Sequence, residues 1–182
     1  MLFRSHTNKG KVNTPARYER LKQLGIDAEF KGWRDTGKHI LLCPSSQTVT
    51  YQMNGISQEE WIKTAIQEIS KHTDREIRLR NKPRPGNKWW NTDIKDDLKD
   101  CYALVTNMSL SAVDAVLNKV PVVTHSNNVC YKVSGPLAGI NERTMPARED
   151  ITMWLRGVAN NQFTLQEIED GLAYEVLSKQ YG

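Results

Sequence analysis

A short run of apolar residues between two chain-breaking residues most limits what this sequence can fold into. His39 to Cys43 reads His-Ile-Leu-Leu-Cys, with Gly37 shortly before it and Pro44 directly after it. Strands of parallel sheets are covered by helices on both faces and are apolar throughout, whereas a strand with one wet face alternates. Residues 39–43 are therefore predicted to form the first strand of a parallel sheet.

Strand-like and helix-like segments alternate after this run. Ser57 followed by Glu60 matches a helix capping box, and the apolar residues behind it repeat at helical spacing up to Ile69. Further strands are expected at 76–80, 103–106 and 121–124, and further helices at 93–99 and from Ser109 or Ser111 to 117. This alternation implies right-handed crossovers, so we predict a Rossmann-like α/β fold, an open parallel sheet flanked by helices.

The two ends of the sequence differ from this alternating region. Residues 1–36 are polar and rich in Lys and Arg, and they are predicted to be a basic extension with one helix from Pro15 to Leu24. Residues 37–182 are predicted to form a single α/β domain. Its two C-terminal helices, at 148–158 and 165–177, are expected to cover the sheet, the second opening on a Thr164–Glu167 capping box.

Composition excludes several classes of protein. Of the 182 residues, 38% are hydrophobic and 25% are charged, a balance typical of one globular domain rather than of a disordered or fibrous chain. No apolar run approaches the roughly 20 residues of a membrane-spanning helix, and residues 1–11 hold no signal-peptide core. Three widely spaced cysteines fit buried thiols better than disulfides or a metal site, so we predict a cytoplasmic protein without a metal.

Ligands of an open parallel sheet bind beyond the carboxyl ends of its strands. The loops expected there are 44–48, 81–90, 107–111 and 125–139. In the third, Ser109 and Ser111 stand at a helix start, where hydroxyls and free backbone N–H groups suit a phosphate, and Asp114 could accept hydrogen bonds from a ribose. The same residues are also good helix caps and dipole partners, and this plainer interpretation stays open.

Two other loops carry candidate groups. His125 follows the last predicted strand and could act as a general base or as a donor to phosphate, or serve as a hydrogen-bonded structural residue. Lys82 and Arg84 lie in a proline-containing loop, with Trp89 and Trp90 nearby. Charge and stacking there could hold an anionic sugar nucleotide or single-stranded nucleic acid; a solvated loop whose tryptophans pack on the core is the alternative.

Several stretches of the sequence resemble a known family. Residues 97–123 read as a strand, a Ser-rich turn, a helix with an acidic residue and then Pro-Val-Val, and residues 80–85 form a basic strand end that contains prolines. These stretches, together with loop 131–140, look like the nucleotide-binding half of GT-B-type glycosyltransferases, in particular the capsule-type 3-deoxy-manno-octulosonic acid transferases. The tail at 154–168 is similar to a phage-borne glycosyltransferase-like group.

The resemblance implies a donor substrate and a set of binding residues. A nucleotide sugar would be the donor, no other cofactor would be needed, and a phage protein would act in the host cytoplasm. By position, Ser109 and Ser111 would hold phosphate, and Asp114 would hold the ribose. Lys82 or Arg84 would bind the anionic donor, and His125 and Asn127 would line the pocket. Such enzymes hold the acceptor with a second α/β domain, for which the 36 residues before Gly37 are too few. We therefore expect either a homodimer that completes the cleft or a binding domain without catalysis.

Three functions are expected as alternatives. The first is glycosyl transfer from a nucleotide-activated sugar to an unknown acceptor, which for a basic protein of net charge +4 includes modified phage DNA. The second is a non-catalytic nucleotide-binding protein that sequesters a small signalling nucleotide in the same pocket. The third is an interaction module whose C-terminal helices dock a partner.

Overall fold

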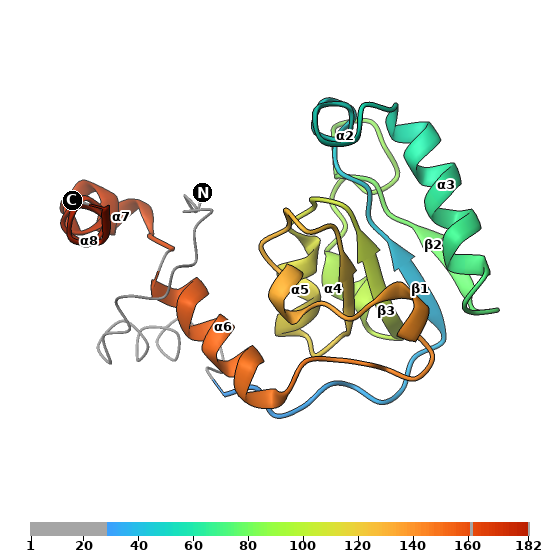
Figure 1. Cartoon of the computed structure of the whole chain (residues 1–182). Helices are drawn as coiled ribbons and strands as arrows, with labels where there is room; N and C mark the ends of the chain where they lie inside the picture. Colours follow the sequence, from blue (N-terminus) through green and yellow to red (C-terminus); the bar gives the residue numbers. More distant parts are fainter. Residues whose placement is uncertain (1–28, 161, 182) are drawn as a thin grey trace. The chain divides into compact units, whose positions relative to one another are not determined.

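The computed structural model describes residues 29–160 and 162–181, and its chain divides into two compact units (Figure 1). One unit comprises residues 31–147, and the other comprises the two ends of the chain, 1–30 and 148–182. The helix predicted from Pro15 to Leu24 lies outside the described residues. The strands and the predicted site all belong to the unit 31–147.

This unit holds the alternation predicted from the sequence. Its elements are β1 (His39–Leu42), α2 (Gln47–Asn54), α3 (Gln58–Ser70), β2 (Glu76–Leu79), α4 (Ile94–Leu98), β3 (Cys101–Thr106), α5 (Ser111–Leu117), β4 (Val122–Thr124) and the short 3-10 helices η1 (Tyr131–Val133) and η2 (Leu137–Gly139). All strand pairs are parallel, in the order β2-β1-β3-β4. The predicted Rossmann-like α/β fold, an open parallel sheet flanked by helices, is confirmed.

The strand order reverses direction between β1 and β3. The chain leaves β1 toward β2 and then crosses back to add β3 and β4 on the other side of β1. Right-handed crossovers place α3 on one face of the sheet and α4 and α5 on the other, as Figure 1 shows. Leu42 pairs with both Leu79 and Val105, so β1, β2 and β3 end level with one another. The loops that follow these strands therefore meet at one edge of the sheet.

The core forms where the two central strands are covered on both faces. Every residue of β1 and β3 is buried, which confirms the prediction made for the run at 39–43. On one face, Ile40, Leu42 and Val105 pack with Ile69 of α3 and with Ile140, which follows η2. Burying an aliphatic side chain of this size contributes about 1.5–3 kcal/mol, so these two strands anchor the loops at their ends.

The helix α2 was not predicted, and the reason is its sequence pattern. Val49, Tyr51 and Met53 recur at every second position, which is the period of a strand, and only Thr50 in the helix is buried. Local signals at the two ends decide the structure instead. Ser46 is the N-cap, with its Oγ accepting the Val49 N–H at 3.4 Å, and Gly55 ends the helix at φ +70°.

Gly37 occupies a position before β1 that no other residue fits. Gly37 has φ +151°, and a Cβ there would lie 2.4 Å from the Tyr102 Cα. The absent side chain lets the segment before β1 run against the start of β3, where Lys38 N–H donates to Asp100 O at 2.8 Å.

The described part of the second unit is helical: α6 (Arg148–Asn160), α7 (Leu165–Glu169) and α8 (Leu172–Tyr181). The capping box predicted at Thr164 and Glu167 is present with both of its hydrogen bonds, at 3.2 and 2.7 Å. The single helix predicted over 165–177 is wrong, because Gly171 adopts φ +79° and separates α7 from α8. Among the described residues, none of the helices is long and apolar enough to cross a membrane.

Candidate functional site

A cavity of about 810 Å³ opens at the edge of the sheet where β1, β2 and β3 end. Its wall comes from four segments: residues 43–46 with Val49 after β1, 80–83 after β2, 91–94 at the start of α4, and 108–111 with Asp114 around the start of α5. The loops after β1 and β3 flank the place where the strand order reverses. Ligands of open α/β sheets bind at that place, and the cavity has the volume of a small-molecule site.

Asn107 holds the loops after β1 and β3 together. Its Oδ1 accepts the Ser45 N–H at 3.0 Å, and its Nδ2 donates to Thr50 Oγ1 at 3.3 Å and to Asn54 Oδ1 at 3.4 Å. Asn107 is 2% exposed, so these bonds do not compete with water. A second bond crosses the same gap, from the Met108 N–H to Ser45 Oγ at 3.1 Å. The two loops are thus fixed before any ligand arrives.

Hydrogen bonds within the loop occupy the backbone N–H groups at the start of α5. The Ser109 N–H donates to Thr106 Oγ1 at 3.2 Å, and the Ser111 N–H and hydroxyl donate to Ser109 Oγ at 3.3 and 2.9 Å. The free backbone N–H groups predicted at Ser109 and Ser111 are therefore engaged within the loop. The linked side chains of Ser109 and Ser111, rather than these amides, line the cavity at the start of α5.

The start of α2 offers the cavity a helix N-terminus, the role that the sequence analysis gave to the start of α5. Its N-cap Ser46 and its first-turn Val49 both line the cavity. The N-terminus of a helix carries a partial positive charge, and α2 has no acidic residue in its first turn to offset it. An anionic group in the cavity would therefore be stabilised at this end of α2.

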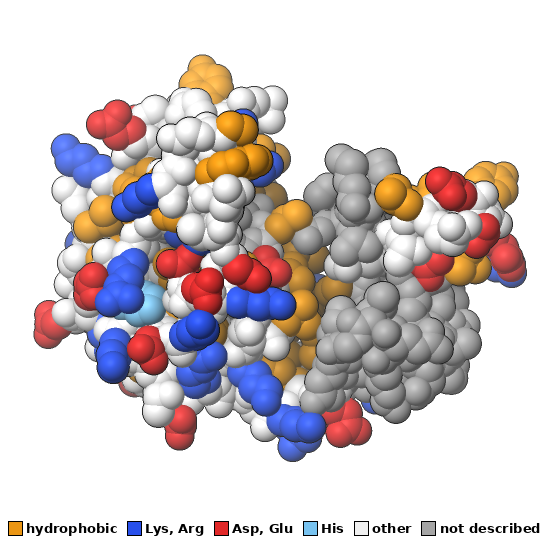
Figure 2. Space-filling model, turned by 180° about the vertical axis from the view of Figure 1, so that it is seen from behind, with side chains coloured by type: hydrophobic (Ala, Val, Ile, Leu, Met, Phe, Trp, Pro, Cys, Tyr) orange, Lys and Arg blue, Asp and Glu red, His pale blue; other side chains and the backbone are white. Residues whose placement is uncertain are grey.

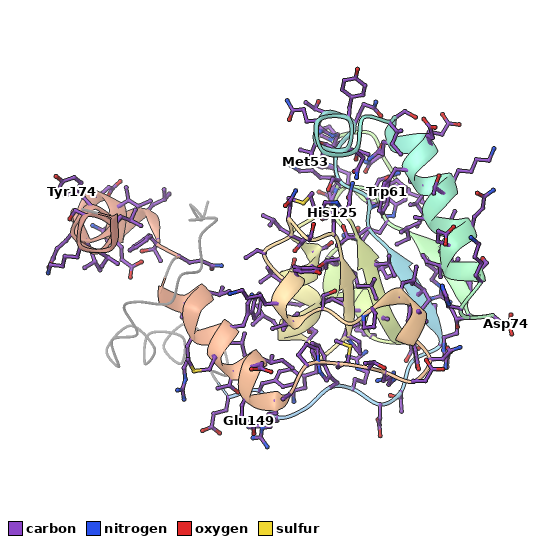
Figure 3. All side chains as sticks on the ribbon, in the orientation of Figure 1. Met53, Trp61, Asp74, His125, Glu149 and Tyr174 are labelled. Carbon is purple, nitrogen blue, oxygen red and sulfur yellow. The ribbon has the colours of Figure 1, made fainter. Side chains whose placement is uncertain are left out.

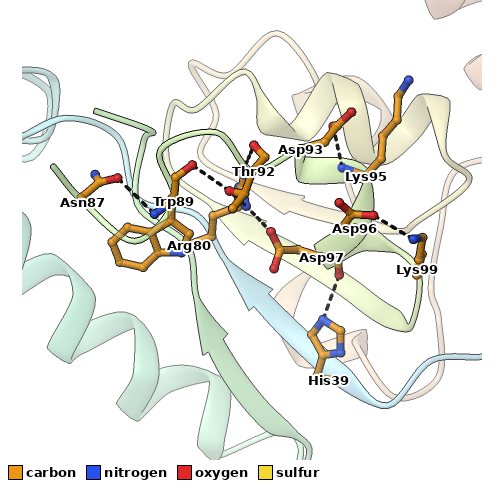
Figure 4. A network of polar contacts seen from close by, with 10 residues as sticks. All are labelled: His39, Arg80, Asn87, Trp89, Thr92, Asp93, Lys95, Asp96, Asp97 and Lys99. Carbon is orange, nitrogen blue, oxygen red and sulfur yellow. Dashed lines mark hydrogen bonds and ion pairs between the residues drawn. The ribbon is translucent and has the colours of Figure 1, made fainter. Parts of the chain in front are cut away.

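Arg80 forms part of the cavity wall from the end of β2 and is only 5% exposed. Its guanidinium donates to Thr92 Oγ1 at 3.1 Å and to Thr92 O at 3.0 Å, and it forms an ion pair with the Asp97 carboxylate of α4 (Figure 4). A buried guanidinium needs such partners, because an unpaired charge in the core is strongly destabilising. Arg80 thus ties the end of β2 to the start of α4.

The same network continues through Asp97 to His39 (Figure 4). The His39 Nε2 lies 3.1 Å from the backbone oxygen of Asp97, and the side chain is 1% exposed. Burial, with the nearby positive charge of Arg78, lowers the pKa of His39 from its ordinary value. His39 is therefore a neutral structural residue at neutral pH rather than a group that faces the cavity.

Asn81 supplies an unused acceptor in the cavity wall. Its Oδ1 is buried and has no hydrogen-bond partner among the described residues. Buried polar atoms in folded proteins nearly always have a partner, so this oxygen is a weak point of the wall. A hydroxyl or an exocyclic amine of a bound molecule would reach it once the Asn81 side chain turned toward the cavity.

The structure brings four of the seven predicted site residues to this cavity and leaves three outside it. Those in the wall are Lys82, Ser109, Ser111 and Asp114. Arg84 is exposed further along the same loop as Lys82. His125 lies at the carboxyl-terminal end of the sheet (Figure 3), where its Nδ1 accepts the N–H of exposed Asn127 at 3.3 Å.

Four residues in or beside the wall were not among the predicted site residues: Ser45, Arg80, Asn81 and Asn107. Arg80 and Asn81 follow β2 directly, and Asn107 follows β3, so the position of each beyond a strand end was a usable signal. The signal did not say which side chains turn inward. The Asn107 contacts join residues 62 positions apart in sequence, which no local pattern encodes.

The predicted burial of the cysteines is confirmed. Cys43, Cys101 and Cys130 are all buried free thiols. Burial raises the pKa of Cys43 and of Cys101 to about 12, so neither is a thiolate at neutral pH, although Cys43 borders the cavity. In the described parts of the chain, 29–160 and 162–181, no group of three His, Cys, Asp or Glu side chains is placed to hold a metal ion.

The cavity wall is chemically divided. Val49, Ile94, Met108 and Leu110 supply apolar surface, and the serines, Asn81, Lys82 and Asp114 supply polar groups.

Comparison with protein-family models, with curated proteins and with solved structures finds no match to this chain. What the cavity binds is therefore inferred from its own side chains.

Proposed function

We propose that this protein binds a nucleotide-activated sugar in the cavity at the strand-order reversal and transfers the sugar to an acceptor. The observation that supports this most is the mixed wall at that position: apolar surface for a base, hydroxyls and amides for the sugars, and positive charge for the diphosphate. A purely apolar ligand would take water from the serines, Lys82 and Asp114 without replacing its hydrogen bonds, so the wall favours a ligand with many polar groups.

The diphosphate is assigned to the side of the cavity formed by Lys82 and the start of α2. Lys82 is exposed and forms no ion pair with another described residue, so its charge is available to a ligand. The charge of Arg80, in contrast, is already shared with Asp97. Lys82 and the partial positive charge at the α2 N-terminus together would hold two phosphates by charge.

The sugar and ribose hydroxyls are assigned to Ser109, Ser111 and Asp114, which line the cavity around the start of α5. In the proposed reaction, the bond between the anomeric carbon and the diphosphate oxygen breaks, and the diphosphate leaves with the electron pair. A bond forms from the acceptor oxygen to the anomeric carbon, and the acceptor proton passes to water or to a wall carboxylate. Electrostatic stabilisation of the leaving diphosphate by Lys82 is the main contribution expected from the protein.

A second function, sequestration of a small nucleotide without turnover, is favoured by one observation. His125, the side chain proposed from the sequence as a general base, does not line the cavity. Binding requires no base, whereas transfer gains typically 10²–10⁴-fold from one. The same cavity could therefore hold a nucleotide unchanged.

Thermal unfolding against a ligand panel tests binding. The panel contains uridine, cytidine, guanosine and adenosine sugar nucleotides together with cyclic nucleotides, each at about 1 mM. A ligand present at 100 times its Kd stabilises the folded state by about 2.7 kcal/mol, which gives a clear rise in Tm. Lys82→Gln should weaken that rise, and Arg84→Gln, which removes the same charge from the same loop outside the cavity, should leave it unchanged.

Turnover separates the two functions. A transferase should hydrolyse its sugar nucleotide slowly without an acceptor, releasing free sugar and nucleoside diphosphate that chromatography detects. A sequestering protein should return the ligand intact. No rise in Tm with any nucleotide, or equal losses in the Lys82 and Arg84 variants, would contradict the assignment of the cavity.

A further inference from the structure

The loop between β2 and α4 is positively charged and its charges are unused. We call residues 81–92 the basic loop; it contains Lys82, Arg84 and Lys88 and no acidic residue. All three side chains are exposed, and none of them pairs with a carboxylate in the described chain. The basic loop therefore presents three exposed cations that no carboxylate of the described residues neutralises.

The acidic residues that follow the basic loop do not neutralise it. Asp93 accepts the Lys95 N–H at 2.9 Å, Asp96 pairs with Lys99 at 2.7 Å, Asp97 pairs with Arg80, and Asp100 lies 3.9 Å from Lys38. Figure 4 shows the partners of Asp93, Asp96 and Asp97, and Asp100 has its own partner before β1. Of these described carboxylates, only Asp93 keeps an unpaired charge beside the basic loop, because it accepts a backbone N–H, so the loop retains an excess of positive charge.

The basic loop also exposes a flat apolar surface. Trp90 is 48% exposed, and the Lys88 Nζ lies over the ring of Trp89 at 4.7 Å from its centroid. A half-exposed indole offers a flat ring on which a base can stack. Cations beside an exposed indole match phosphates beside a base.

The loop is held in one conformation by its own backbone contacts. Asn87 Oδ1 accepts the N–H groups of Arg84 and Trp89 at 3.4 and 3.1 Å, and Asn87 Nδ2 donates to Lys82 O at 3.1 Å. At the base of the loop, Thr92 is bound to Arg80. A pre-ordered loop loses little conformational entropy when it binds, so its cations and ring act together.

The face of the molecule seen from behind does not favour a duplex. Figure 2 shows blue and red side chains interleaved over the lower part of this face, rather than one broad basic stripe. Proteins that bind duplexes present such a stripe, and the bases of a duplex are stacked inside it, out of reach of Trp90. An acidic peptide would satisfy the cations but not the exposed indole. A single strand satisfies both.

We infer that the basic loop binds single-stranded nucleic acid, with a base stacked on Trp90 and phosphates on Arg84 and Lys88. Asn81, Lys82 and Pro83 of the same loop line the cavity, so the strand would pass its mouth. Resting on the proposed function, this makes a nucleotide of the strand the sugar acceptor. Binding of the strand itself does not depend on that function.

Fluorescence anisotropy with a labelled 12-nucleotide single strand, as DNA and as RNA, tests the inference in the full chain. Trp90→Ala should weaken binding about tenfold, since stacking of one base is worth roughly that much or more, and Trp90→Phe should retain most of the affinity. Lys88→Gln should weaken binding several-fold and reduce the salt dependence by about 0.7 in the log–log slope. Matched controls are Lys63→Gln, an exposed lysine on α3, and Tyr174→Ala, which removes an aromatic side chain that is 79% exposed on α8.

Three results would overturn the inference: no binding at 50 mM salt, equal affinity for duplex DNA and heparin with Trp90→Ala unchanged, or tighter binding of a poly-glutamate peptide. The last would identify an acidic protein partner instead. Asp114→Ala should lose the Tm rise with nucleotide and keep the single strand, while Trp90→Ala should do the reverse. A strand that binds to a protein that no nucleotide stabilises would uphold the docking surface and remove only its role as acceptor.

Discussion

Replacing Asn107 by Ala tests whether one buried amide holds the cavity together. Asn107 and Ser45 are 2% and 6% exposed, and the Ser45 N–H depends on Asn107 Oδ1 at 3.0 Å. A buried donor left without an acceptor costs about 1–3 kcal/mol. The two further bonds, at 3.3 and 3.4 Å, are long and add less than about 1 kcal/mol. We expect Asn107→Ala to lower the free energy of unfolding by about 2–3 kcal/mol.

Urea unfolding measures this loss directly. With an m value near 2 kcal/mol/M, the midpoint should fall by roughly 1–1.5 M while m stays unchanged. Asn141→Ala is the matched control, since Asn141 also makes two side-chain hydrogen bonds, to His72 O and from Arg75, but is exposed. That variant should lose less than about 1 kcal/mol. A midpoint for Asn107→Ala within 0.2 M of wild type, roughly 0.4 kcal/mol at that m value, would refute the role given to its side chain.

Three further outcomes follow from buried groups in the unit 31–147. Cys43 and Cys101 should resist thiol reagents in the native protein at pH 8, because burial raises the pKa of each to about 12, and should react once urea unfolds the chain; fast native labelling would contradict this. The folded state lowers the pKa of His39 below its ordinary 6.5, so the unfolded state binds a proton first as the pH falls. Stability should therefore be full above about pH 7.5 and decline below pH 6.5 down through the folded pKa, by at most about 1.4 kcal/mol per pH unit. His39→Phe should flatten this decline in urea midpoints between pH 7.5 and 5, and an unchanged slope would count against it. Gly37→Ala should cost more than about 2 kcal/mol in thermal unfolding, because its Cβ would lie 2.4 Å from the backbone of β3, whereas Gly55→Ala, with open space around it, should cost about 1 kcal/mol; equal losses would refute the steric reason.

The strands and most helices of the sheet-bearing unit could be predicted because their signals are local. A continuous apolar run predicted β1 at 39–43 against an observed 39–42, and Ser57 predicted the start of α3. The prediction failed where the spacing of apolar residues disagreed with the capping and glycine signals. The strand-like alternation in 47–54 hid α2, and the helical periodicity of 165–177 hid the break at Gly171. The order of the strands depends on long-range pairing and had no local signal.

The candidate site was predicted at the level of loops rather than of side chains. Parallel strands end at a common edge, so the loops after β1, β2 and β3 were expected to meet, and they do. Lys82 lines the cavity, whereas Arg84, two residues on, does not. Asn87 sets the local course of the loop, because its side chain accepts the Arg84 N–H and donates to Lys82 O. His125 follows the outermost strand β4, and its loop contributes no residue to the cavity wall.

The contacts between Arg80 and Thr92 separate the tip of the basic loop from the sheet. The base of the loop is closed by Arg80, directly after β2, and Thr92, shortly before α4. This closure does not depend on the identity of the residues at the tip. Each doubling of a loop's length costs only about 0.6 kcal/mol in closure entropy. The segment 83–90 is therefore a replaceable cassette: its sequence and length could be exchanged, in evolution or by grafting, to give the same sheet a new ligand.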